Sequence, residues 1–116
     1  MKLSSDIAAI VTGAGSGLGA AVASRLASAG VKVALFDKDT QKGLAQAEAI
    51  GGLFVEVDVS DATSVATAIT AARQAHGQER LVINCAGIAP AAKTVSRGNA
   101  HDAGLFEAVI AINLIG

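Results

Sequence analysis

The sequence is poor in the residues that build several common kinds of site. Among its 116 residues it has no tryptophan, no tyrosine, one proline and one cysteine. The single cysteine, Cys85, cannot form an internal disulfide, and together with His76 and His101 it gives none of the ligand spacings of a metal site. We therefore expect no disulfide framework and no bound metal, and a protein of a reducing, cytoplasmic compartment.

Long apolar runs and an excess of one charge are also missing. The apolar stretch near the N-terminus, Ile7–Val11, is too short for a signal-peptide core or a membrane span. Nine lysines and arginines face ten aspartates and glutamates, which gives a formal net charge of −1 and no basic block for a nucleic-acid backbone. The composition argues against nucleic-acid and membrane partners.

Aliphatic residues are abundant: hydrophobic residues make up 52% of the chain and aromatic ones only 3%. Four short apolar runs predict buried strands, at residues 7–11, 31–36, 53–57 and 81–83. Helical patterns lie between them, from Leu18 to Ala29, from Asp39 or Thr40 to Ile50, and from Asp61 to Gly77, and another begins near Asp102. The intervening segment, from Gly87 to about Ala100, is expected to be a loop.

Strands that alternate with helices imply right-handed crossovers and a parallel sheet. The expected fold is an α/β, Rossmann-type doubly wound sheet with helices on both faces, in strand order 3-2-1-4. Four strands are half of that architecture. On the first helix, helical spacing places these residues on the apolar face: Leu18, Ala21, Val22, Leu26 and Ala29.

The stretch TGAGSGLG, residues 12–19, places four glycines directly after the first strand and at the start of the first helix. A helix N-terminus offers unpaired N–H groups and a partial positive charge, so a phosphate can dock there if no side chain blocks it. Gly13, Gly17 and Gly19 are expected to serve the turn, the approach of a pyrophosphate and the contact of helix with strand. No Gly-Lys-Ser/Thr follows, which disfavours a nucleoside-triphosphate site.

Two acidic residues follow strands at informative places. Asp37 comes about 20 residues after the glycines, where a carboxylate can bind the adenosine ribose hydroxyls and repel a 2′-phosphate, which favours NAD over NADP despite the adjacent Lys38. The alternative is that Asp37 only caps the next helix. Asp58 could accept a hydrogen bond from an adenine amino group while Val59 packs on the ring, or it could be a simple turn acid.

These motifs, taken in order, resemble the signatures of the short-chain dehydrogenase/reductase family: Thr12-Gly13-x-x-x-Gly17-x-Gly19, Asp58-Val59, Asn84-Cys85-Ala86-Gly87 and Asn113. The resemblance implies an NAD site formed by Gly13, Ser16, Gly17, Leu18, Gly19, Asp37, Asp58, Val59, Asn84, Cys85, Ala86 and Gly87. Cys85 is expected to pack against the cofactor, because a small buried cysteine need not react. The cysteine and the long loop after it are similar to the type-2 3-hydroxyacyl-CoA dehydrogenases.

Asn113 continues a helical stripe of Phe106, Val109 and Ile110, so an amide is expected on a face that buries hydrocarbon. A buried amide must find hydrogen-bond partners. Taken alone, it is best interpreted as a core asparagine bonded to neighbouring backbone. The family resemblance implies a catalytic role instead, in which Asn113 holds a water in a proton relay.

The resemblance also implies a catalytic Ser, Tyr and Lys, and the sequence contains no tyrosine. We therefore expect residues 1–116 to be the N-terminal part of a single NAD-binding domain in a roughly twice-longer, tetrameric oxidoreductase. Its small-molecule substrate would be a secondary alcohol, such as a 3-hydroxyacyl-CoA or a hydroxysteroid. A non-catalytic dinucleotide-binding module and a structural domain whose glycines serve only tight turns are the alternatives.

Overall fold

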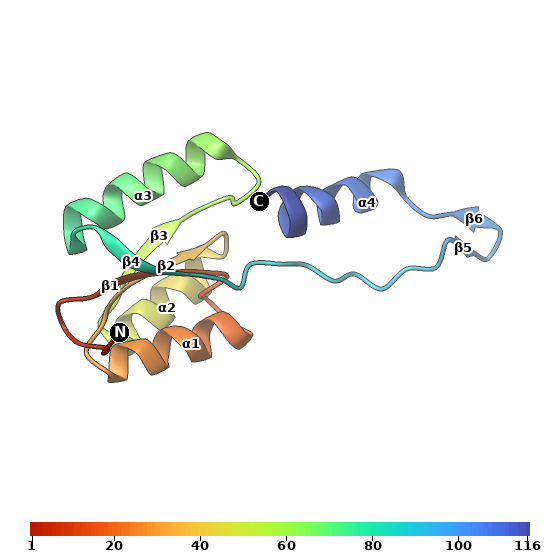
Figure 1. The fold of residues 1–116 in the computed structure, drawn as a ribbon. Helices are drawn as coiled ribbons and strands as arrows, with labels where there is room; N and C mark the ends of the chain where they lie inside the picture. The colour runs from red at the N-terminus through yellow and green to blue at the C-terminus, as the bar shows by residue number, and fades with distance from the viewer.

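The computed structural model describes residues 1–116 and contains a four-stranded parallel sheet in the order β3-β2-β1-β4 (Figure 1). This is the strand order expected from the sequence. The strands are β1 (Ala8–Thr12), β2 (Lys32–Asp37), β3 (Leu53–Glu56) and β4 (Glu79–Asn84). The helices that connect them are α1 (Gly17–Ser28), α2 (Thr40–Ile50) and α3 (Ala62–His76).

Helices cover both faces of the sheet (Figure 1). Val33 and Leu35 of β2 pack with Ala23 of α1 and Ala47 of α2, whereas Phe36 belongs to the opposite cluster, which includes α3. Because successive strand residues point to opposite faces, a strand covered on both sides has to be apolar throughout. That requirement explains the continuous apolar runs of the sequence.

The buried face of α1 differs from the expected one. Gly19, Ala23 and Leu26 are buried, whereas Leu18 is 81% exposed. The helix rests on the sheet through its small residues, which let the two backbones approach closely. Of the predicted face, Leu26 is buried and Val22 packs against the core, but Leu18 and Ala21 stay at the surface, and Gly19 and Ala23 are buried in their place.

The chain beyond β4 leaves the body of the domain. It runs through an extended segment to a small hairpin, β5 (Val95–Ser96) with β6 (Asn99–Ala100), and returns through α4 (Ala103–Ile110) and the π-helix η1 (Ala111–Ile115) (Figure 1). The hairpin replaces part of the expected loop. Arg97 and Gly98 both have positive φ, 50° and 80°, as a two-residue type I′ hairpin turn requires.

No helix combines the length and the apolar composition that a bilayer crossing would need.

Candidate functional site

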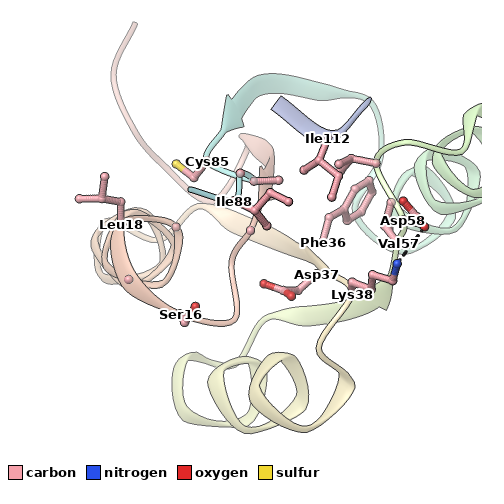
Figure 2. A pocket seen from close by; sticks show the side chains of 16 residues that line it. Ser16, Leu18, Phe36, Asp37, Lys38, Val57, Asp58, Cys85, Ile88 and Ile112 are labelled. Carbon is pink, nitrogen blue, oxygen red and sulfur yellow. Dashed lines mark hydrogen bonds and ion pairs between the residues drawn. The ribbon is translucent and has the colours of Figure 1, made fainter. Parts of the chain in front are cut away.

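A cleft of about 380 Å³ opens at the carboxyl ends of the central strands, where the glycine turn, the end of β2 and the segments after β3 and β4 meet (Figure 2). It brings together all the predicted cofactor residues except Asn84. Phe36, Lys38, Val57, Ile88 and Ile112 complete the lining. The strands of a parallel sheet end at one edge, so residues distant in sequence converge there.

The N-terminus of α1 at this cleft has no side-chain cap. Ser16, its N-cap residue, is extended and makes no capping hydrogen bond, whereas Asp39, Asp61 and Asp102 cap the other three α-helices. The first N–H groups of a helix have no partner within the helix, and the helix dipole places partial positive charge there. The start of α1 is thus a free anion-binding end.

The three predicted glycines have three different surroundings. Gly13 has φ of +63°, and a Cβ there would lie 2.8 Å from the backbone of Ala86, so this turn needs glycine. A Cβ on Gly19 would collide with the Gly13 carbonyl oxygen, so α1 starts directly against the turn. Gly17 has φ of +54°, and a Cβ there would meet no atom within 4 Å, so its surroundings are open.

Gly15 is a site residue that the sequence reasoning did not single out. Its N–H donates a hydrogen bond to Asp37 Oδ2 at 2.8 Å, and a Cβ on Gly15 would lie 2.9 Å from that oxygen. The signal in the sequence that could have identified Gly15 was its place among four glycines at alternate positions. Gly15 therefore keeps the carboxylate against the turn.

Asp37 points toward the glycine turn rather than capping α2 (Figure 2). Its Oδ1 accepts from the Asp39 N–H at 2.8 Å, while Asp39 is the cap, accepting from the Lys42 N–H at 3.0 Å. The capping interpretation of Asp37 is therefore wrong. A carboxylate has about four acceptor positions, and two backbone donors leave others free for hydroxyl groups.

Asp58 lies at the rim of the cleft, in the segment after β3, and its side chain makes several hydrogen bonds. Its Oδ1 accepts from the backbone N–H and the hydroxyl of Ser60, and Lys38 Nζ lies 3.1 Å from its Oδ2. The Ser60 hydrogen bonds, with a smaller contribution from Lys38, lower the pKa of Asp58 to about 2. Asp58 is thus a turn acid that also lines the cleft beside Val59.

Thr12 fixes the segment after β4. Its Oγ1, in a residue only 9% exposed, accepts from the N–H groups of Cys85 and Ala86, both at 3.1 Å. The sequence reasoning did not predict this role, although Thr12 opens the glycine motif. The hydroxyl links the end of β1 to the wall of the cleft.

Asn84 lines a second cavity, of about 490 Å³, with Phe36 and Val65 among its walls, and not the cleft. Adjacent strand residues alternate in direction, so Asn84 and Cys85 leave the end of β4 toward different sides. Cys85 is half-buried and lines the cleft, as expected from the resemblance.

Asn113 is exposed, contrary to the expected buried stripe, and Phe106 is 59% exposed. Its Oδ1 accepts from the Ile88 N–H at 2.9 Å and its Nδ2 donates to the Ile88 carbonyl at 2.7 Å. The stripe fails because α4 projects from the domain and buries none of its residues. The amide is bonded to backbone, as in the interpretation of Asn113 taken alone, but the residue is not in the core and its partner is Ile88 at the rim of the cleft.

Comparison with known proteins yields relatives that are described as dehydrogenases or reductases. The 3-hydroxyacyl-CoA dehydrogenase type-2 of Bos taurus is 40% identical over 114 residues, covering 95% of this chain and 44% of that protein. The protein of the same name from Drosophila melanogaster is 41% identical over 111 residues, covering 92% of this chain and 44% of that protein. The chain therefore spans less than half the length of these relatives.

A crystal structure described as ribose-5-phosphate isomerase from Brucella melitensis 16M has a TM-score of 0.83 and 33% identity, covering 94% of this chain and 41% of that one. The likeness confirms the α/β fold. A family model described as short chain dehydrogenase matches residues 7–116. Because the family model matches nearly the whole length of the chain, the chain belongs to the short-chain dehydrogenase family.

Proposed function

We propose that this chain forms the NAD-binding part of an oxidoreductase that transfers hydride between a secondary alcohol and the nicotinamide ring. The observation that carries the proposal is the uncapped start of α1, which opens on a cleft with Asp37 at its edge. An anionic diphosphate fits a helix N-terminus whose N–H groups are free and whose approach is clear.

The residues around the cleft suit the parts of a dinucleotide. The backbone N–H groups of Gly17, Leu18 and Gly19 would hold the diphosphate, since Gly17 leaves the space beside them open. Asp37 would accept the ribose hydroxyls through its remaining acceptor positions. When bound, NAD supplies the hydride acceptor, while the protein supplies binding and orientation.

The remaining lining would hold the two ends of the cofactor. Asp58 and Val59 would bind the adenine, and the backbone from Cys85 to Gly87 would lie along the nicotinamide half. NAD is favoured over NADP, because the Asp37 carboxylate would repel a 2′-phosphate.

The substrate proposed is a 3-hydroxyacyl-CoA or a hydroxysteroid-like secondary alcohol. The 40% identity to a 3-hydroxyacyl-CoA dehydrogenase type-2 supports this class. We also propose a cytoplasmic tetramer and retain the relay role of Asn113 as a prediction. Isomerase activity is not proposed, because the matching family and the two relatives named for comparison are dehydrogenases.

Calorimetric titration with NAD and NADP tests the binding proposal. Wild type is expected to bind NAD more tightly than NADP. Asp37→Ala should weaken NAD binding by about tenfold or more, because hydrogen bonds to a charged group contribute about 1.5–3 kcal/mol. Asp39→Ala is the matched control: it removes the α2 cap outside the cleft and should lower stability without changing affinity. Absence of NAD binding by wild type would overturn the proposal.

A non-catalytic dinucleotide-binding module is the second candidate. It is supported by the free start of α1 and the lining of the cleft, which account for dinucleotide binding without a catalytic step. The family resemblance assigns proton exchange with the substrate to a tyrosine. Both candidates predict NAD binding. Sequencing the gene past Gly116 separates them, because only the enzyme requires a Tyr-x-x-x-Lys segment.

A further inference from the structure

Lys38 and Asp58 form an ion pair across the rim of the cleft, with Nζ 3.1 Å from Oδ2 (Figure 2). Lys38 directly follows Asp37 at the end of β2, and Asp58 lies just beyond β3. Both line the cleft, where Lys38 is the only cationic side chain. The position of the Lys38 ammonium group therefore affects how strongly the cleft attracts a ligand that carries an additional negative charge.

Asp58 is well prepared to hold the ammonium group. Two hydrogen bonds from Ser60 fix Oδ1, which leaves Oδ2 directed to Lys38. The pKa of Asp58 is lowered to about 2, so the carboxylate stays ionised at neutral pH. The charged partner of Lys38 is thus present at physiological pH.

Without Asp58, the Lys38 side chain would be free to turn toward the neighbouring Asp37. Its side chain is 73% exposed and its only ion-pair partner is Asp58. A lysine carries a compact charge on a flexible four-carbon stem, which can follow an anion over several ångströms. Because Lys38 directly follows Asp37 in the sequence, a 2′-phosphate on a ribose held by Asp37 would lie close to Lys38.

We propose that Asp58 is a second specificity-determining residue of the cleft, which keeps Lys38 away from a ribose 2′-phosphate. The inference rests on the proposed dinucleotide site. Asp37 disfavours the phosphate by repulsion, and Asp58 disfavours it by withholding the one cation that could attract it. Discrimination against NADP therefore depends on three neighbouring side chains rather than on Asp37 alone.

The size of the effect follows from the exposure of the pair. Exposed ion pairs are weak, so releasing Lys38 is expected to change the ratio of NADP to NAD dissociation constants by about two- to fivefold. A lost adenine contact at Asp58 would weaken both dinucleotides alike and cancel in this ratio. The ratio therefore isolates the effect on the 2′-phosphate.

A double-mutant cycle tests the proposal by calorimetry. Asp58→Asn keeps the acceptor for Ser60 but removes the charge, and should lower the ratio by about two- to fivefold where Lys38 is present. In the Lys38→Met background the same substitution should leave the ratio nearly unchanged. An equal fall in both backgrounds would mean that only the overall charge matters, and would overturn the proposal, as would no fall in either.

Lys38→Met alone gives a test that does not require Asp58→Asn to fold. Because Lys38 is already withheld, the ratio should stay close to that of wild type. A clear rise in the ratio would show that Lys38 already serves the phosphate and would overturn the inference. If wild type binds NAD but the double-mutant cycle shows no coupling between Lys38 and Asp58, this inference alone is refuted. If wild type binds no NAD, the proposed function is refuted together with the inference.

Discussion

Gly15 and Asp37 are joined by a 2.8 Å hydrogen bond from the glycine N–H to the carboxylate, which connects the glycine turn to the end of β2. The residue proposed to bind the ribose therefore also holds the turn that is proposed to bind the diphosphate. A disturbance of either partner should affect both parts of the proposed site.

Replacing Gly15 with alanine is predicted to impair ligand binding more than stability. The new Cβ would meet Asp37 Oδ2 at 2.9 Å and the backbone N of Gly43 at 3.2 Å, so the carboxylate, as the end of a side chain, has to swing away and α2 has to yield by a few tenths of an ångström. Its displacement should weaken NAD binding several-fold, while the change in the free energy of unfolding stays within about 1 kcal/mol. Calorimetric titration and urea unfolding measure the two effects.

Gly104→Ala is the matched control for this prediction. Gly104 also donates to an aspartate, Asp102, at 2.8 Å, and a Cβ there would lie 3.2 Å from the same oxygen, but the pair lies outside the cleft. It should leave affinity unchanged. Equal losses of affinity in the two variants would show that the Gly15–Asp37 contact has no special role.

Thr12→Val should destabilise the domain, because it leaves the N–H groups of Cys85 and Ala86 without their acceptor. An unsatisfied buried donor costs about 1–3 kcal/mol, so a loss in this range is expected in urea unfolding. Thr12→Ser keeps the hydroxyl and loses one methyl group, at a cost of about 0.8 kcal/mol. A serine variant less stable than the valine variant would contradict the assigned role of the hydroxyl.

Asn113→Ala should release the rim of the cleft at Ile88. Both hydrogen bonds between the side chain and Ile88 are lost, at 2.9 and 2.7 Å, so exchange of the Ile88 amide hydrogen should accelerate by about tenfold. Hydrogen exchange followed by NMR gives the readout. Asn99→Ala in the hairpin is the control and should not alter exchange at Ile88, and unchanged protection in Asn113→Ala would refute the prediction.

His76 is predicted to make stability depend on pH below neutrality. Burial, with a smaller effect from Lys32, lowers its pKa from 6.5, and no hydrogen-bond partner meets its Nδ1. A histidine whose folded pKa is lowered contributes fully above pH 6.5, and the contribution is lost as pH falls from there through the folded pKa.

Urea unfolding at about pH 7.5 and about pH 5.5, on either side of the ordinary histidine pKa, checks the sign. The stability of wild type should fall more between these two values than that of His76→Gln, because the variant has no imidazole to protonate. The difference between the two proteins removes the contribution of the carboxylates they share. A larger fall in the variant would show that the folded state favours the charged imidazole.

The position and type of most elements were predictable because their signals are local. Apolar runs flanked by glycine predicted four strands to within about two residues, and Asp39 and Asp61 cap the helices they precede. The glycine motif also predicted an open helix start. The β5–β6 hairpin was missed because Arg-Gly is a weak turn signal. The π-helix η1 was missed because such a short element leaves no distinct periodicity in the sequence.

The candidate site was predictable in its membership and less so in its contacts. All the expected cofactor residues except Asn84 lie in one cleft. The assignment of Asn84 depended on the direction in which β4 ends, and the stripe around Asn113 depended on what packs against α4. Neither follows from spacing along the chain.

The sequence by itself determined the alternation of strands and helices and the helix caps, because each depends on a few consecutive residues. That alternation implies a parallel sheet, whose strands all end at one edge, and so it also predicted that the glycines and acids gather there. Only the tertiary structure decided the pairing of Gly15 with Asp37, Lys38 with Asp58 and Asn113 with Ile88. Such pairs join separate elements, and strand register and helix placement bring their atoms within hydrogen-bond distance.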